Sequence, residues 1–198
     1  ARHVVPGVPH HIVQRGNRRL DVFFDRDDYC AYLALLRDKC IAEGTQILAY
    51  CLMPNHVHLI AVPPDENGLR KVGEVHRLYT RHVNFKMGWR GYLWQGRFAS
   101  YPMDDAYLYE AVRYIELNPV RAGLCHAPEA YPFSSARQRL TGYGEGDLQV
   151  SPLKPMVNDW KTYWREGLEK DAVRQLFEQN EITQAPLGNI DTATPGTQ

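Results

Sequence analysis

TQILAYCLMPNHVHLIAV, residues 45–62, predicts two β-strands joined by a tight turn. The halves TQILAYCLM and HVHLIAV are rich in residues that favour strands, and Pro54 and Asn55 between them have the chemistry of a turn. Strands joined by so short a connection pair in antiparallel fashion. We therefore expect a central hairpin, beside which the other strands are placed.

The segments on either side of this hairpin predict the rest of the sheet. HHIVQR, residues 10–15, is a short strand-like run followed by a Gly-Asn turn signal, and GYLWQGRFASYPM, residues 91–103, predicts an approach loop and a further strand. Apolar residues recur at helical spacing over residues 26–42 and 69–87. This order of elements predicts an α+β protein with a ferredoxin-like split βαβ arrangement, in which an antiparallel sheet has its helices mainly on one face.

A further helix is marked at both ends. Asp104 and Asp105 stand where N-cap and first-turn carboxylates favour a helix, and the run AYLYEAVRYIEL follows them. Pro119 cannot donate the hydrogen bond that a continuing helix needs. We therefore expect this helix to stop near Asn118.

Charge and composition divide the chain at about residue 140. The formal net charge is zero, yet residues 1–140 hold 18 Lys and Arg against 14 Asp and Glu, whereas residues 141–198 hold 5 against 9. We expect a mildly basic body over 1–140, a linker and helical extension over 141–181 and a disordered tail over 182–198. The acidic extension either keeps the chain soluble or covers a basic groove of the body, and both interpretations stay open.

Several classes of protein do not fit this composition. No apolar run reaches membrane-spanning length, so we expect no transmembrane segment. The first residues, ARHVVPGVPHHIVQRGN, lack the apolar core of a secretion signal, which favours the cytoplasm. No P-loop or Gly-rich dinucleotide motif is present, so we expect no nucleotide cofactor. The four cysteines form no CxxC pair and predict reduced, buried thiols: Cys30, Cys40, Cys51 and Cys125.

His56 and His58 are two residues apart in a predicted strand, so their side chains project from the same face. Two imidazoles at this spacing can bind one metal ion, although they make an incomplete site. The alternative is that one or both are ordinary half-buried or surface residues. The surrounding run HVHLI is typical of a central strand, where two polar rings on one face need a reason. That placement favours a metal site.

Tyr114 and Asn118 are four residues apart on the helix that follows Asp105, so they share one of its faces. A hydroxyl and an amide can then point into one site. Two other interpretations stay open. Tyr114 packs in the core, as other tyrosines of the same helix would, and Asn118 caps a new helical turn that begins at Pro119. The spacing alone does not separate these alternatives.

Four blocks of sequence, in order along the chain, resemble one family. They are PGVPHHIVQRGNRR, AYCLMPNHVHLIAVP, YLWQGRF and YLYEAVRYIELNPVRAGL, and YPFSSA at residues 131–136 resembles the region that follows the family's catalytic helix. Together they resemble the REP-associated tyrosine transposases, which are relatives of the single-tyrosine transposases of the HUH endonuclease superfamily, over roughly residues 3–140. HUH denotes two histidines that flank a bulky apolar residue, as they do in the HVH of this chain.

The resemblance implies a role for each residue that matches the family's motifs. His56 and His58 would be the HUH metal ligands, Tyr114 the nucleophile and Asn118 the third, amide ligand, at a position where many relatives have Gln. It implies Mg²⁺ or Mn²⁺ as the cofactor, whereas imidazole ligands by themselves suit zinc or other transition metals. The ordinary pKa of tyrosine is about 10, so attack at neutral pH needs help from a group that the sequence does not identify.

The resemblance also implies an activity. Residues 1–140 would form a HUH single-tyrosine transposase catalytic domain that cleaves and rejoins single-stranded DNA through a 5′-phosphotyrosine. The implied substrate is a REP hairpin with a short flanking tetranucleotide, and the implied state is a monomer. Two alternatives from other classes stay open. One is a non-catalytic hairpin-binding protein derived from a transposase, and the other is a metal phosphoesterase that uses water and leaves no covalent adduct.

Candidate DNA-binding residues lie near these sequence blocks. Cationic side chains hold the backbone of a single strand, and aromatic faces stack on its bases. Each candidate taken alone is also typical of a solvated charge or a core aromatic residue. The predicted set comprises Arg15, Asn17, Arg18 and Arg19 after the first strand, Arg77 and Arg81 on the helix over 69–87, and Trp94 and Arg97 in the aromatic segment.

Overall fold

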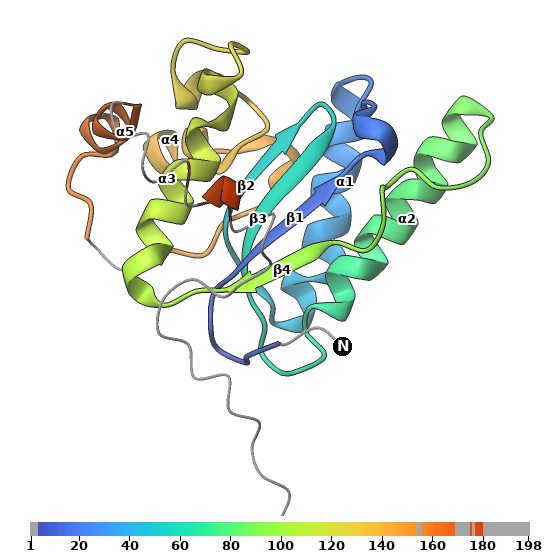
Figure 1. Ribbon diagram of the computed structural model, residues 1–198, viewed down its shortest axis with the longest axis horizontal. Coiled ribbons are helices and arrows are strands. Elements are labelled where there is room, and N and C mark those ends of the chain that lie inside the picture. Colours follow the sequence, from blue (N-terminus) through green and yellow to red (C-terminus); the bar gives the residue numbers. More distant parts are fainter. Residues whose placement is uncertain (1–3, 154–155, 169–174, 176, 180–198) are drawn as a thin grey trace, which may run out of the picture.

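The sheet has four strands, and their order confirms the predicted ferredoxin-like split βαβ arrangement (Figure 1). A computed structural model describes residues 4–153, 156–168, 175 and 177–179. All three strand pairings are antiparallel, and the spatial order is β2-β3-β1-β4, which places the first strand between the last two, as two split βαβ units require. The strands are β1 (His10–Arg15), β2 (Gln46–Met53), β3 (His56–Val62) and β4 (Ala99–Pro102).

The predicted hairpin is confirmed. β2 and β3 are joined by the two residues Pro54 and Asn55. β1 pairs with the other edge of β3, and Arg15 at its end lies opposite His56. β3 is therefore an inner strand, and its histidines lie at the end nearest the turn.

One face of the sheet is covered by α1 (Arg26–Lys39) and α2 (Arg70–Met87), which are the two predicted helices of the βαβ units (Figure 1). Residues that alternate with the histidines along β3, such as Val57 and Leu59, are buried there in the larger apolar core. Tyr32 of α1 and Val75 of α2 belong to the same core. Burial of one such side chain contributes about 1.5–3 kcal/mol, so this face is the main source of stability.

The opposite face is covered by α3 (Asp105–Arg121), and the second apolar core lies between them. Cys51 of β2 and Ile60 of β3 pack there with Val112 and Ile115 of α3. The expected placement of the helices on one face thus describes α1 and α2, while α3 lies on the other face. β2 and β3 are apolar on both faces, and a strand of this kind has to be covered on both sides.

The predicted start of α3 is confirmed and its predicted end is wrong. The side chain of Asp104 caps the helix by accepting hydrogen bonds from two backbone amides of the first turn. At the other end α3 continues through Asn118 and Pro119 to Arg121. Pro119 lies in the last turn, where it removes only one intrahelical bond, and the carbonyl oxygens of both residues accept bonds from amides beyond the helix.

The described part of the C-terminal region confirms a helical extension. α4 (Ser135–Thr141) precedes the extension, and α5 (Trp160–Leu168) lies within the linker and helical extension predicted over 141–181. The predicted disordered tail over 182–198 lies outside the described residues. Short 3-10 turns complete the described chain at Asn17–Arg19, Ile41–Glu43, Pro128–Ala130 and Glu145–Asp147.

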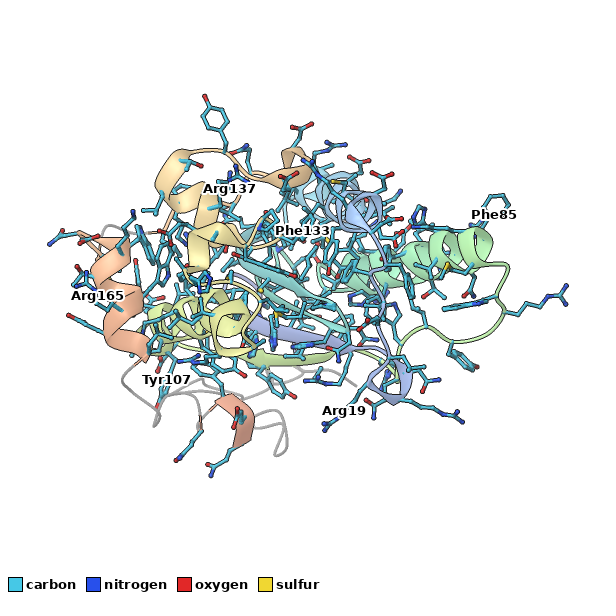
Figure 2. All side chains as sticks on the ribbon, turned by 90° about the horizontal axis from the view of Figure 1, so that it is seen from above. Arg19, Phe85, Tyr107, Phe133, Arg137 and Arg165 are labelled. Carbon is cyan, nitrogen blue, oxygen red and sulfur yellow. The ribbon has the colours of Figure 1, made fainter. Side chains whose placement is uncertain are left out.

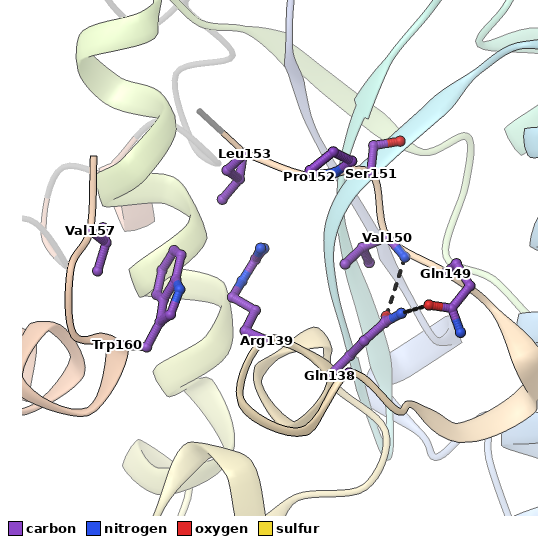
Figure 3. A pocket seen from close by; sticks show the side chains of 10 residues that line it. Gln138, Arg139, Gln149, Val150, Ser151, Pro152, Leu153, Val157 and Trp160 are labelled. Atoms are coloured by element: carbon purple, nitrogen blue, oxygen red, sulfur yellow. Dashed lines mark hydrogen bonds between the residues drawn. The ribbon is translucent and has the colours of Figure 1, made fainter. Parts of the chain in front are cut away.

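A buried carboxylate attaches this extension to α3. Glu116 accepts hydrogen bonds from Ser135 Oγ at 2.6 Å, from Arg139 Nε at 2.5 Å and from Trp164 Nε1 at 3.0 Å. Beside this network lies a hollow of about 300 Å³, where Arg139 faces Trp160 (Figure 3). The network holds the outer side of α3, while its inner side faces the sheet.

Candidate active site

Three imidazoles lie on the face of the sheet that α3 covers. His56 and His58 project from β3 toward α3, as their spacing predicts, and their ring centroids are 4.9 Å apart. The third imidazole, His11 of β1, stacks on His58 with a centroid distance of 5.3 Å. His11 belongs to the predicted strand over residues 10–15, but no motif in the sequence linked it to the two histidines of β3.

Each of the two predicted ligands has a partner at Nδ1. Nδ1 of His56 lies 2.6 Å from Oδ1 of Asn55, and Nδ1 of His58 lies 3.0 Å from Nε2 of His11. Histidines that bind metals through one nitrogen commonly donate a hydrogen bond from the other, which orients the ring. In each ring, a proton on Nδ1 leaves the lone pair on Nε2, which is the form that can bind an ion.

The three imidazoles are neutral at physiological pH. Burial, together with the smaller effect of the nearby positive charge of Arg15, lowers the pKa of His56 to about 3. Burial also lowers the pKa of His11 to about 3, and it is the main cause that holds the pKa of His58 well below its ordinary value. A metal ion binds the neutral form of imidazole, so no proton has to be removed from these rings first.

Tyr114 lies on the inner side of α3 and meets the imidazoles there. Its ring is edge-on to His58, with centroids 5.9 Å apart and an interplanar angle of 86°. It also meets His11 edge-on at 6.2 Å. Only 5% of Tyr114 is exposed, so it is both a core residue and a neighbour of the histidines.

Asn118 is one turn further along α3 and is half-buried. The interpretation that it caps a new helical turn is wrong, because the helix continues through it. Its Nδ2 atom is buried and has no hydrogen-bond partner among the described residues. This unpaired NH₂ group is suited to an acceptor such as a phosphate oxygen, whereas a metal ion would bind the Oδ1 atom of the amide.

The donor set fits a divalent ion with open coordination positions. No group of three or more His, Cys, Asp or Glu side chains gathers into a metal site among the described residues. The two imidazoles, with the amide of Asn118 one helical turn beyond Tyr114, offer fewer donors than the six positions that Mg²⁺ or Mn²⁺ fills. Such a set holds an ion and leaves positions for water and phosphate oxygens.

Phe177, a described residue of the extension, covers Tyr114. The two rings stack with centroids 4.9 Å apart and an interplanar angle of 17°, and Phe177 also meets His11 edge-on at 5.8 Å. Phe177 is fully buried. In the sequence it is one apolar residue of a helical run, so nothing there linked it to the site.

The first group of predicted DNA-binding residues adjoins the histidines. Arg15 pairs with His56 across β1 and β3, and the turn Asn17–Arg19 follows it directly. The three residues of this turn are exposed, and Arg19 projects outward from the edge of the molecule (Figure 2). These side chains therefore lie beside His56, at the end of β3 nearest the turn.

The second group lies around a hollow between α2 and the segment before β4. Arg77, Arg81, Trp94 and Arg97 all line this hollow of about 540 Å³. Trp94 is only 7% exposed and its indole donates to a backbone carbonyl of α2, so it is largely a core residue. Tyr92 lines the same hollow and is 91% exposed, which makes it the more accessible aromatic side chain.

A second hollow of about 300 Å³ connects the two groups. It is lined by Arg15 together with Arg97 and Gln14, and the last two also line the hollow beside α2. A basic path therefore runs from α2 past the ends of β1 and β4 to the histidines.

The chain matches a known protein family over the residues that form the sheet and the site. The family model described as IS200-like transposase matches residues 4–118, which is more than half of the chain and includes His56, His58, Tyr114 and Asn118. The chain belongs to the IS200-like transposase family. The predicted resemblance to these transposases is thereby confirmed.

Two relatives agree with this family. A Haemophilus influenzae protein named as a REP-associated tyrosine transposase is 28% identical over 111 residues, which cover 50% of this chain and 63% of the relative. This transposase chain thus matches less than two thirds of that relative's length. The solved structure of a REP-associated tyrosine transposase bound to a REP hairpin aligns with a TM-score of 0.58 at 21% identity, covering 80% of this chain and 95% of that one. This second likeness supports the fold.

The transposase has no helix suited to a bilayer within the part of the chain that the structure describes. None of those helices combines the length and the apolarity that crossing a membrane requires.

Proposed function

We propose that this chain is a metal-dependent transesterase that cleaves and rejoins single-stranded hairpin DNA, with Tyr114 as the nucleophile. The observation that carries the proposal is the edge-on contact of the Tyr114 ring with His58, 5.9 Å between centroids. A nucleophile on a helix and a metal-binding pair on a strand then face one site. Core packing alone would not require three neutral imidazoles beside the tyrosine.

The cleavage step is an in-line substitution at phosphorus. The hydroxyl oxygen of Tyr114 forms a bond to the scissile phosphorus, and the bond from phosphorus to the 3′ oxygen breaks. The products are a 5′-phosphotyrosine and a 3′-hydroxyl, and the proton lost by the tyrosine balances the one gained by the leaving oxygen. The reverse attack by a 3′-hydroxyl reseals the strand without a nucleotide cofactor.

His56 and His58 would hold the cofactor, Mg²⁺ or Mn²⁺, through their Nε2 atoms, with Asn118 as a third ligand. When bound, such an ion supplies charge stabilisation at the scissile phosphate. The residues of the chain orient the reacting groups. β3 and its neighbours fix the histidines, and Glu116 fixes the helix that carries Tyr114.

The substrate we propose is single-stranded DNA that folds into a REP-type hairpin. The basic path supports this choice, because cationic side chains and exposed aromatic faces are the features that hold single strands. We assign contacts with the DNA backbone to one amide side chain and six arginines. They are Asn17, Arg15, Arg18, Arg19, Arg77, Arg81 and Arg97. We assign base stacking to Tyr92, and to the accessible edge of Trp94.

We further propose that the enzyme acts as a monomer in the cytoplasm, with residues 1–140 as its catalytic domain. Tyr114 and the histidines that it meets belong to the same chain, so one copy contains the whole constellation. All four cysteines are free of disulfide bonds, although Cys30 and Cys125 are half-buried rather than buried. Free thiols agree with a reducing compartment.

The test is a covalent adduct. The protein is incubated with Mn²⁺ and a REP-type hairpin oligonucleotide that is labelled at its 3′ end, because the fragment 3′ of the cut would stay on the tyrosine. We expect a labelled, denaturant-resistant protein band for the wild type and its complete loss in Tyr114→Phe. Tyr109→Phe, on the same helix, is the matched control and should keep the band.

Two other outcomes would replace this proposal. Cleavage that continues in Tyr114→Phe without an adduct would mean that water attacks the phosphate. Binding of the hairpin by the wild type without any cleavage, in either Mn²⁺ or Mg²⁺, would mean that the chain is a non-catalytic binding protein.

A further inference from the structure

Asn55, the second residue of the β2–β3 turn, contacts a proposed metal ligand on one side and the basic turn, Asn17–Arg19, on the other. Its Oδ1 lies 2.6 Å from Nδ1 of His56. Its Nδ2 donates a hydrogen bond of 3.0 Å to the carbonyl oxygen of Arg19. One amide side chain therefore joins two parts of the proposed active site.

The direction of both hydrogen bonds follows from what each atom can do. A backbone carbonyl oxygen only accepts, so the amide NH₂ of Asn55 has to face Arg19 and its oxygen has to face His56. The amide oxygen also only accepts, so Nδ1 of His56 carries the proton. A neutral imidazole has one N–H, and Nε2 of His56 is left with the lone pair.

We propose that Asn55 is a positioning residue that fixes His56 in the tautomer able to bind a metal ion through Nε2. This inference rests on the proposed function, which makes His56 a ligand. Asn55 touches neither the ion nor the DNA in this assignment. Its effect is to select one of two tautomers and one ring orientation before the ion binds.

The surroundings hold Asn55 rigidly enough for this role. Its own carbonyl oxygen accepts from the amide of Gly16 at 2.8 Å, and the carbonyl oxygen of Pro54 accepts from the amide of Val22 at 2.8 Å. Only glycine fits at position 16, since a Cβ there would lie 2.2 Å from the carbonyl oxygen of Leu20 and 3.2 Å from that of Asn55. The β2–β3 turn and residues 16–22 are thus joined by several hydrogen bonds.

The carbonyl oxygen of Arg19, which accepts the hydrogen bond from Asn55, is oriented by an uncommon backbone conformation. Arg18 and Arg19 have φ angles of 54° and 62°, in the left-handed region that residues other than glycine rarely adopt. This conformation presents the Arg19 carbonyl to Asn55. The same turn carries the exposed arginines that we assign to DNA, so DNA contact and ligand orientation are linked through Asn55.

The first experiment determines the tautomer directly. Imidazole ¹⁵N NMR of the metal-free protein at neutral pH should show the proton of His56 on Nδ1. Asn55→Ala removes the acceptor, so we expect a large share of His56 to carry its proton on Nε2 instead. Asn55→Asp keeps an acceptor in the same place and should restore the Nδ1–H form. A wild-type His56 with its proton on Nε2, or an unchanged tautomer in Asn55→Ala, would overturn the proposal.

The second experiment measures Mn²⁺ affinity without DNA, from the loss of the free-ion EPR signal. We expect Asn55→Ala to weaken the affinity about 10- to 100-fold, the range typical of lost partners of metal-binding histidines. Asn55→Asp should stay close to the wild type. The matched control is Asn84→Ala, which removes a hydrogen bond of the same kind and length, from Asn84 Nδ2 to the Gly91 carbonyl at 3.0 Å, far from the histidines.

The two experiments separate failure of this inference from failure of the proposed function. Wild-type protein that shows the Nδ1–H tautomer but binds no Mn²⁺ would sink the metal-dependent function and leave the role of Asn55 in selecting the tautomer intact. Asn55→Ala that binds Mn²⁺ as tightly as the wild type would sink the positioning role alone. Alanine fits the turn, because Asn55 is not in the left-handed region.

Discussion

The two faces of the sheet each bury a pair of rings, one tyrosine and one histidine, at the same distance. On the α1 and α2 face, Tyr32 and His76 have centroids 5.9 Å apart, and on the α3 face Tyr114 and His58 also have centroids 5.9 Å apart. The first pair is nearly parallel, at 25°, whereas the second is perpendicular, at 86°. Residue types and distance do not distinguish them.

The hydrogen bonds do distinguish the two pairs. The hydroxyl of Tyr32 lies 2.8 Å from Nε2 of His76, so each ring satisfies the other inside the core. Nδ1 of His58 is instead paired with a further imidazole, His11, and the tyrosine approaches from the edge. The Tyr32–His76 hydrogen bond agrees with a structural role, whereas the pairing of His58 with His11 agrees with the proposed role of His58 as a metal ligand.

The largest expected difference between the pairs concerns metal binding and adduct formation. His58→Ala removes a proposed ligand, and we expect Mn²⁺ affinity and the rate of adduct formation to fall at least about 100-fold. Loss of a residue that only hydrogen-bonds to a metal ligand already weakens metal binding by up to about this factor, and loss of the ligand itself should do no less. Tyr32→Phe removes the buried hydrogen bond between the Tyr32 hydroxyl and His76 and should cost about 1–3 kcal/mol of stability. Its adduct formation should be unchanged below its Tm.

Metal titration, the adduct assay and thermal unfolding of both variants test this contrast. The functional distinction between the faces would fail if Tyr32→Phe abolished the adduct in folded protein. It would fail equally if His58→Ala still bound Mn²⁺ like the wild type.

A smaller effect is expected at Phe177, which covers only the Tyr114 pair. Its ring stacks on Tyr114, and an aromatic pair of this kind contributes about 0.5–1.5 kcal/mol. We expect Phe177→Ala to raise the rate of adduct formation about 2- to 10-fold while lowering Tm. Leu168→Ala, at an exposed position of the same extension, is the control. An unchanged or slower rate in Phe177→Ala would mean that the ring does not restrict access to Tyr114.

The smallest effect concerns the pH dependence of stability in metal-free protein. Burial lowers the pKa of His11 from its ordinary value of 6.5 to about 3. The unfolded chain therefore takes up a proton first as pH falls, and the free energy of unfolding decreases from about pH 6.5 down to about pH 3. His11→Gln removes one such group, so the slope over this range should flatten by up to about 1.4 kcal/mol per pH unit. Denaturant unfolding at pH 4, 5, 6 and 7, chosen as roughly even steps across the range, measures this slope of the free energy of unfolding against pH. An equally steep slope in the variant would show that His11 takes up its proton in the folded state.

Most of the fold could be predicted from local signals. Strand propensity and a two-residue turn define the hairpin, and the carboxylate of Asp104 marks the start of α3. The end of α3 could not be predicted in this way. Pro119 usually stops a helix, but here backbone bonds beyond Arg121 satisfy the carbonyls of the last turn.

Some features of the site could likewise be predicted from local patterns, and others could not. The two-residue repeat of β3 places His56 and His58 on one face, whereas the approach of Tyr114 depends on how α3 crosses the sheet. The contacts of Asn55 with Arg19 and of Phe177 with Tyr114 join residues far apart in sequence. No local pattern encodes such contacts, because they arise only when the turn, the basic segment and the extension have packed together.

The buried carboxylate of Glu116 has a consequence for protein engineering. It lies between Tyr114 and Asn118 in sequence but points to the opposite side, toward Arg139 and Trp164. A chimera that grafted α3 alone onto another scaffold would bury this charge without its partners, at a cost of about 3–5 kcal/mol. The smallest transferable unit is thus the helix together with α4 and α5.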